Sequence, residues 1–513
     1  MADPFIGRPF SMPMMKPFIP KVLQPWIYMV FAAFYQMVNV VYLGSMSQMV
    51  GSLSLMREDV MMIAMFGIVG VAMPFPFLFR LKFRFTNRQL LLFSTSGMLL
   101  CNVLATFVTF MPLLCVLSFA CCFMKLMGTF ECMSNIQLWM TPRRDFRIFF
   151  PLLYIIVLGD MSLSAWIAQN ITFFTGQWQM MQWLVAGLLT LILIFCVTCL
   201  QDFRFMRPLP FISIDWLGML LWATLLLEII FIFNYGEYYN WWDSAMWRMA
   251  FYAIFPTTWI CIRRMVHIRH PYIDPAAFRY KTLAPIMLMF AVCEWMNATP
   301  NVLENAFRGS VLHYGMMATS RFNLISIVGN VTGCLFCLWW MKMLHQKYTR
   351  LLTVGFFFLL VYQVMMYFYI TPTLNIERLY FPTFIRAFGY TIFFVTLTIY
   401  LEDLMPFQHF FMGLTMAGFV RNGPMMAFTS GVYEYMLRYH VADNLSSGMT
   451  FTPAESVMMG IKQLYGVTCI IGSVFMLLLM LYHVQPVRST LNLIPYWNVI
   501  GREMRKELQK EAH

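Results

Sequence analysis

The sequence predicts an all-α integral membrane protein, and two observations predict this class: the composition and the shape of the apolar runs. Of the 513 residues, 60% are hydrophobic and only 11% are charged, whereas globular domains are about 25% charged. The apolar residues form continuous runs, such as 184–200 and 468–482, and not the short alternating strands of a membrane β-barrel. Because about 20 apolar residues cross a bilayer as a helix, this apolar mass suffices for about fourteen spans. A soluble enzyme and a β-barrel are both excluded.

The predicted spans are the apolar runs between polar residues or Pro and Gly breaks. They lie at 22–43, 58–79, 90–109, 111–136, 148–171, 180–200, 212–234, 246–266, 282–305, 319–343, 351–370, 379–401, 407–437 and 461–484. Six spans, a closely connected pair and six further spans predict a six-helix bundle at 22–205, an inserted pair at 212–267 and a second bundle at 282–484. Segments 1–21 and 485–513 are predicted to be tails. Two similar bundles that move about a midplane site are typical of transporters.

Lysine and arginine are distributed unevenly between the two sets of loops. Most of the 35 cations lie in alternate segments, within 8–21, 80–88, 143–147, 204–207, 263–281, 342–350 and 488–510, whereas the opposite segments hold few, such as Arg57, Arg308 and Arg438. Cations collect in cytoplasmic loops, so both termini are expected to be cytoplasmic. The same bias explains the net charge of +12 without a nucleic-acid partner.

Several motifs resemble those of one transporter family. The inserted pair and the loop after it carry IDWLG at 214–218, GEYYNWWDS at 236–244, HPYIDP at 270–275 and Phe278-Arg279, and the twelfth span carries PTFIRAFG at 382–389. Arg421-Asn422-Gly423-Pro424 falls where that family has an Arg-x-x-Gly motif. With these motifs the chain resembles the major facilitator superfamily, and within it the fourteen-helix drug:proton antiporter branch, over 22–484. The resemblance implies a major-facilitator-type fold, proton-coupled export of amphiphilic compounds and a location in a bacterial inner membrane.

The sequence also departs from the pattern of that branch. The inner loop RLKFRFTNRQ at 80–89 keeps the arginines of the superfamily motif but lacks its Gly and Asp. The first span has Val38-Asn39-Val40, and the acid that usually stands five positions before the Asn is Phe34 here. The fifth span lacks the antiporter motif with its Gly and Pro. The sequence as a whole therefore supports a transporter. Because of these differences, it supports drug export by proton exchange less strongly.

Ionisable side chains within the spans are the candidates for proton coupling, because placing a charge there costs a few kcal/mol. Asp160, in the middle of the fifth span, is the first candidate, and Glu294 and Glu131 are the others. Glu294 begins a stripe with Asn297, Asn301 and Asn305 on one helical face, which Pro300 is expected to break or kink. For Asp160 the alternative is a buried acid that is hydrogen-bonded to a neighbouring helix. The stripe is expected to line the central cavity, with Asn297 and Asn301 as cavity residues, and the alternative is that it lines a helix interface.

Further polar side chains are candidates for the cavity and the gates. Lys125 shares a face of the fourth span with Gly128 and Thr129, and it lies nearly opposite Glu131. In the resemblance, intramembrane cations such as Lys125 and Arg386 relay protons or bind anionic groups. Other expected cavity residues are Trp166, Gln169, Asn323 and Asn330, and the expected gating residues are Arg84, Arg88 and Arg421. The alternatives are packing, snorkelling and topological roles.

The resulting hypothesis is a secondary active transporter for a small amphiphilic molecule, a monomer without a cofactor and not an enzyme. An importer or exporter of a specific metabolite with different or no ion coupling stays open. So does a membrane-embedded metal enzyme, although the eight histidines are scattered and metal chemistry needs converging ligands. The chain has no Walker-type loop, which argues against an ATP-driven pump.

Overall fold

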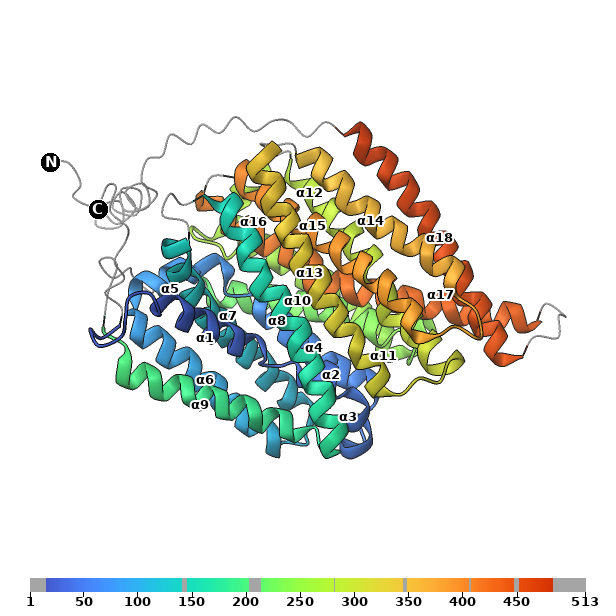
Figure 1. Ribbon diagram of the computed structural model, residues 1–513, viewed down its shortest axis with the longest axis horizontal. Helices are drawn as coiled ribbons and strands as arrows, with labels where there is room; N and C mark the ends of the chain where they lie inside the picture. Colours follow the sequence, from blue (N-terminus) through green and yellow to red (C-terminus); the bar gives the residue numbers. More distant parts are fainter. Residues whose placement is uncertain are drawn as a thin grey trace.

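The computed structural model describes residues 15–140, 145–202, 214–280, 282–344, 348–405, 407–446 and 452–482. Most of both predicted tails lies outside these residues, as do Arg143, Arg144, Arg204, Arg207, Lys281 and Lys347. The described chain is helical almost throughout, as predicted. Figure 1 shows the first half, coloured blue to green, packed beside the second half, coloured yellow to red.

The first half is one bundle that is built around α7. Its long helices pack as α4 and α6 on α7, α1 on α7, and α9 on α6. The elements are α1 Gln24–Gln36, α2 Val41–Gly44, α3 Met46–Leu53, α4 Arg57–Ala72, η1 Phe75–Phe77, α5 Leu78–Arg84, α6 Asn87–Phe107, α7 Met111–Met140, α8 Phe146–Thr175 and α9 Gln179–Cys199.

The second half is a bundle that is built around α15, whose side chains are buried over most of its length. Helices α13 and α14 pack on α15, and α14 and α17 pack on α18. The elements are α12 Leu283–Asn297, η4 Pro300–Glu304, η5 Phe307–Val311, α13 Met316–Leu344, α14 Tyr348–Tyr369, η6 Ile376–Leu379, α15 Tyr380–Leu404, α16 Phe407–Val420, η7 Arg421–Met425, α17 Met426–Ser446 and α18 Pro453–Leu481.

The inserted pair lies against both bundles mainly through its first helix. Its elements are α10 Trp216–Asn234, η2 Trp241–Asp243, α11 Ala245–His267 and η3 Pro275–Arg279. Helix α10 packs on α4 and α17, whereas α11 packs mainly on α10. Asp215 accepts hydrogen bonds from the backbone of Gly218 and from the Arg264 guanidinium, at 2.9 and 2.6 Å, and so joins the two helices. The IDWLG motif is therefore structural at this position.

Local sequence signals fix several helix ends. Thr86 caps α6 and pairs reciprocally with Gln89, and Thr452 caps α18 in the same way with Glu455. These capping boxes satisfy backbone N–H groups that have no partner within the helix. Gly176 ends α8 with φ of 67°, a left-handed conformation that glycine adopts without steric cost.

Ten described helical segments are long and apolar enough to cross a membrane, and the chain is a multi-pass membrane protein. Three further predicted spans are interrupted: the first between α1 and α2, the ninth between α12 and η5, and the thirteenth at η7. The elements η4, η5 and η7 are π-helices. The remaining predicted span is α11, which carries Arg248, Arg263 and Arg264. The predicted count of fourteen is consistent with this pattern.

Candidate functional site

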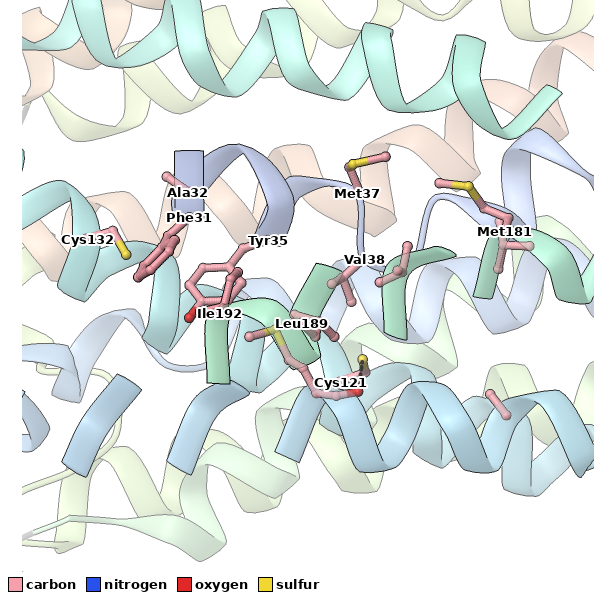
Figure 2. Close-up of a cluster of buried hydrophobic side chains, with 14 of the residues drawn as sticks. Phe31, Ala32, Tyr35, Met37, Val38, Cys121, Cys132, Met181, Leu189 and Ile192 are labelled. Atoms are coloured by element: carbon pink, nitrogen blue, oxygen red, sulfur yellow. Dashed lines mark hydrogen bonds between the residues drawn. The ribbon is translucent and has the colours of Figure 1, made fainter. Parts of the chain in front are cut away.

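The first span breaks in the middle of the N-terminal bundle. Helix α1 ends at Gln36, and the chain becomes helical again at Val41. Figure 2 shows the chain passing Met37 and Val38 without regular helical turns, beside the helix that carries Cys121. Asn39 has φ of 71°, which is uncommon for a residue other than glycine. The break therefore leaves backbone carbonyls without their usual helical partners.

Side chains of α7 bind the broken segment. Lys125 Nζ donates to the carbonyl oxygens of Gln36 and Val38, at 3.1 and 3.2 Å. Ser118 Oγ lies 2.8 Å from Asn39 Oδ1 and 2.8 Å from the Ile63 carbonyl. We call Asn39, Ser118 and Lys125, with the carbonyls of Gln36 and Val38, the N-terminal polar centre. Lys125 and Glu131 do not share a partner here, as their positions on the helix predict.

Asp160 lies on α8, which packs on the first span. Ser45 and Thr172 are hydrogen-bonded at 2.5 Å, and Gly44 lies against Ala168, so α8 packs closely on the end of the first span. Within the described chain, the buried Oδ2 of Asp160 has no hydrogen-bond partner. Asp160 therefore stays a candidate for binding and releasing a proton.

Glu131, the third predicted coupling acid, lies in a separate buried cluster. It pairs with Lys82 at 3.4 Å, and the two side chains are 1% and 2% exposed. Lys82 also bonds Ser134, and the Asn135 amide lies 3.5 Å from Glu131. The sequence predicts that Lys82 lies in an inner loop, but in the structure it is buried in the bundle beside Glu131. The pairing has a physical reason, because a buried charge without a partner is costly.

The C-terminal bundle has a polar centre of its own, formed by Glu294, Tyr390 and Arg421. Glu294 Oε1 accepts from Arg421 Nε at 2.7 Å and from the Tyr390 hydroxyl at 2.9 Å. Arg421 Nη2 also donates to the Tyr390 oxygen at 2.9 Å, and its guanidinium lies 4.0 Å from the centre of the Phe394 ring. We call these three residues the C-terminal polar centre. Arg421 starts the π-helix η7, and π-helices are frequent at functional sites.

The other residues of the predicted stripe lie on both sides of the point where the α-helix of the ninth span becomes a π-helix. Asn297, the last residue of α12, accepts from Arg386 Nη1 at 2.8 Å. Beyond it the chain is π-helical, and Asn301 and Asn305 have exposed side chains, whereas Glu304 is buried. Arg386 Nε is buried and has no hydrogen-bond partner among the described residues.

A seam of amide and hydroxyl groups joins α8 of one bundle to α13 of the other. Asn323 Nδ2 donates to Gln169 Oε1 at 2.9 Å. Asn330 donates to the Leu158 carbonyl at 3.3 Å and accepts from Thr391 at 2.9 Å. The predicted cavity residues Gln169, Asn323 and Asn330 are thus brought together at the interface between the bundles. Trp166 is partly buried on α8, three residues before Gln169.

One buried ionic cluster is missing from the sequence prediction. Arg308 Nη2 lies 3.5 Å from Glu304 Oε2, and Glu304 also accepts from the Tyr362 hydroxyl, which lies 3.4 Å from that of Tyr465. The sequence predicts an external loop at Arg308, but the residue is 8% exposed. The available signal was the spacing of Glu304 and Arg308, because residues four apart on a helix are neighbours.

The predicted gating arginines have three different surroundings. Arg88 bonds the Val197 carbonyl at 2.8 Å and lies 3.7 Å from Asp202, both within its own bundle, and Arg84 is exposed on α5. Arg421 belongs to the C-terminal polar centre. Ion pairs between the bundles are formed instead by Arg147 with Asp403 and by Arg57 with Glu434, at 3.1 and 3.0 Å.

Comparisons with known proteins define the fold. No family model matches the sequence, and no curated protein matches it. Among solved structures, the peptide transporter POT in complex with sulfate is 14% identical with a TM-score of 0.58, covering 92% of this chain and 96% of its own. The nucleoside transporter NupG is 12% identical with a TM-score of 0.54, covering 89% and 98%. The human organic anion transporter MFSD10 is 8% identical with a TM-score of 0.53, covering 88% and 100%.

These likenesses extend over nearly the whole chain. The chain therefore has the major-facilitator-type fold that the sequence predicts. At sequence identities of 8–14%, these likenesses establish the fold and not the activity.

Proposed function

We propose that this protein is a secondary active transporter that exports amphiphilic organic compounds in exchange for protons. It works by alternating access as a monomer in a plasma membrane, the inner membrane of a bacterium, with both termini in the cytoplasm. The observation that carries the proposal is the C-terminal polar centre, in which a membrane-embedded acid is bound by a cation from a different helix. Such an arrangement in a transporter fold is typical of a coupling site.

The chemistry of this centre links a proton to the position of a helix. In its ionised form Glu294 attracts Arg421, and the two are 2.7 Å apart. A proton on Glu294 removes that attraction, because the neutral acid no longer compensates the guanidinium charge. Arg421 lies on the π-helix η7, which packs on α4 of the other bundle. Protonation of Glu294 would therefore loosen a contact that spans the two bundles.

The proposal is tested by proton-driven efflux from reconstituted vesicles. In Glu294→Gln the side chain keeps its size but no longer takes up or releases a proton. We expect gradient-driven efflux to fall by about tenfold or more, the equivalent of about 1.4 kcal/mol. Substrate exchange without a pH gradient should persist, since it needs no net proton movement. Glu377→Gln, an exposed acid outside the centre, is the matched control and should transport normally.

Two results would contradict the proposal. One is wild-type flux that ignores an imposed pH gradient for every compound tested. The other is a Glu294→Gln variant whose efflux keeps its dependence on the gradient. The panel should contain cationic, neutral and anionic amphiphiles together with hydrophilic metabolites. Transport of a single metabolite alone would replace multidrug export by a specific carrier.

A further inference from the structure

We propose that the break in the first span is a binding site for a monovalent cation, and that the ammonium group of Lys125 occupies this site as a built-in ligand. The inference goes beyond the proposed function, because it concerns ion binding in the N-terminal bundle and needs no knowledge of the transported molecule. It starts from the two carbonyl oxygens, of Gln36 and Val38, that converge on one nitrogen atom.

The carbonyls are available because the chain is not helical at 37–40. Inside a bilayer an unpaired carbonyl costs several kcal/mol, so a broken helix needs a replacement partner. In transporters, unwound carbonyls of broken helices coordinate Na⁺ or H⁺ near the midplane. Here the two oxygens lie 3.1 and 3.2 Å from Lys125 Nζ, which are ordinary distances for an N–H donor. The two oxygens thus accept hydrogen bonds from an ammonium group.

The charge balance also supports a cation site. Among the residues that the structure describes, no carboxylate lies within 4.0 Å of Lys125 Nζ. The other buried lysine, Lys82, lies 3.4 Å from the carboxylate of Glu131. Among the described residues, the hydrogen-bond partners of the Lys125 ammonium are therefore backbone carbonyls, the groups that hold a bare monovalent cation in a membrane.

The surrounding side chains fix the break in this form. Asn39 takes the left-handed conformation at φ of 71°, and Ser118 Oγ lies 2.8 Å from its side-chain oxygen. A Cβ on Gly67 would lie 2.1 Å from Asn39 Nδ2, so α4 approaches the break closely. The carbonyls consequently keep their direction when the lysine is removed, and the site remains as a vacancy that a free cation can fill.

The test replaces the lysine and supplies the cation from solution. The purified Lys125→Ala and Lys125→Met variants are compared with the wild type by thermal unfolding in detergent, in ammonium, sodium or choline chloride at equal concentration. We expect the wild type to melt at one temperature in all three salts. The variants should melt lower in choline and should recover by about 2 °C or more, saturably, in ammonium, as a ligand of the folded state requires. In sodium we expect a smaller recovery of the melting temperature, because the carbonyl oxygens would have to move closer together to bind the smaller ion.

A matched control is Lys462→Ala, which removes a lysine whose ammonium lies 5.3 Å from the Tyr367 ring, away from the break. This variant should show the same melting temperature in ammonium and in choline. Equal melting temperatures of the Lys125 variants in the three salts would overturn the proposal, and so would an ammonium effect of the same size in the wild type. Variants that fail to fold even when they are prepared in ammonium would also overturn it. None of these results depends on transport, so failure here is distinct from failure of the proton-exchange hypothesis.

Discussion

At the scale of single residues, Gly67 shows how closely the break is packed. A Cβ at this position would lie 2.1 Å from Asn39 Nδ2 and 2.7 Å from Ser118 Oγ. Both atoms belong to the N-terminal polar centre, and Ser118 is 1% exposed. Neither side chain can move without losing the hydrogen bond between them. The absence of a side chain at Gly67 is therefore a requirement of the site.

We expect Gly67→Ala to lower the free energy of unfolding by about 1–3 kcal/mol, the usual cost of overpacking a core. The loss is measured by denaturant titration in detergent micelles. Alanine is the better helix former by about 1 kcal/mol, so the measured loss understates the steric effect. Gly187→Ala in α9 is the control, because a Cβ there meets nothing within 4 Å. It should be neutral or stabilising, and a Gly67→Ala variant as stable as this control would show that the break is not tightly packed.

Sequence reasoning at this scale identified charged residues but not their partners. Glu294 and Arg421 were both predicted to be functional, yet in different roles, and the structure places them 2.7 Å apart. They are separated by 127 positions in the sequence, and helical spacing tells which face a residue occupies but not which helix it faces. The same limit applies to Lys82 and Glu131. Their pairing depends on how α5 packs on α7, which is tertiary information.

At the scale of elements, the continuous helices were predictable and two of the breaks were not. Apolar runs of sufficient length predict α6, α8, α9 and α14 to within a few residues. Pro300 correctly marks a change of helix type, since its ring removes a backbone hydrogen bond. The break at 37–40 contains neither Gly nor Pro. It is held by close contacts with Ser118 and Gly67 of other helices, so its cause lies outside the local sequence.

The seam between α8 and α13 leads to a prediction about register. Gln169 and Asn323 are hydrogen-bonded at 2.9 Å, so the pair Gln169→Cys and Asn323→Cys should be joined by a short bifunctional thiol reagent in a background without native cysteines. The pair Gln169→Cys and Asn330→Cys is the control, because seven residues shift the second site by about 10.5 Å along the helix. Mass spectrometry of the linked peptides measures both. Equal yields from the two pairs would contradict the register.

At the scale of the whole molecule, ion pairs join the two bundles at both ends of their interface. At the predicted cytoplasmic end, Arg147 of α8 binds Asp403 of α15 at 3.1 Å, and the Asp403 side chain is 4% exposed. At the opposite end, Arg57 of α4 binds Glu434 of α17 at 3.0 Å, with 52% of the arginine side chain exposed. Alternating access requires each end to open in turn. The two pairs are therefore expected to oppose opening at their own ends, with unequal strength.

The unequal burial gives the two ends different predicted sensitivities. Arg147→Ala leaves a buried Asp403 that still accepts from the Tyr348 hydroxyl, so we expect a loss of about 1–2 kcal/mol and a shift of about 5- to 30-fold towards opening at the predicted cytoplasmic end. Arg57→Ala removes an exposed pair that contributes about 0–1 kcal/mol, and should shift opening at the other end by less than about fivefold. Distances between spin labels across each end measure both populations. An Arg147→Ala protein that opens at neither end, or that opens at the Arg57 end, would show that the Arg147–Asp403 pair does not hold the predicted cytoplasmic end closed.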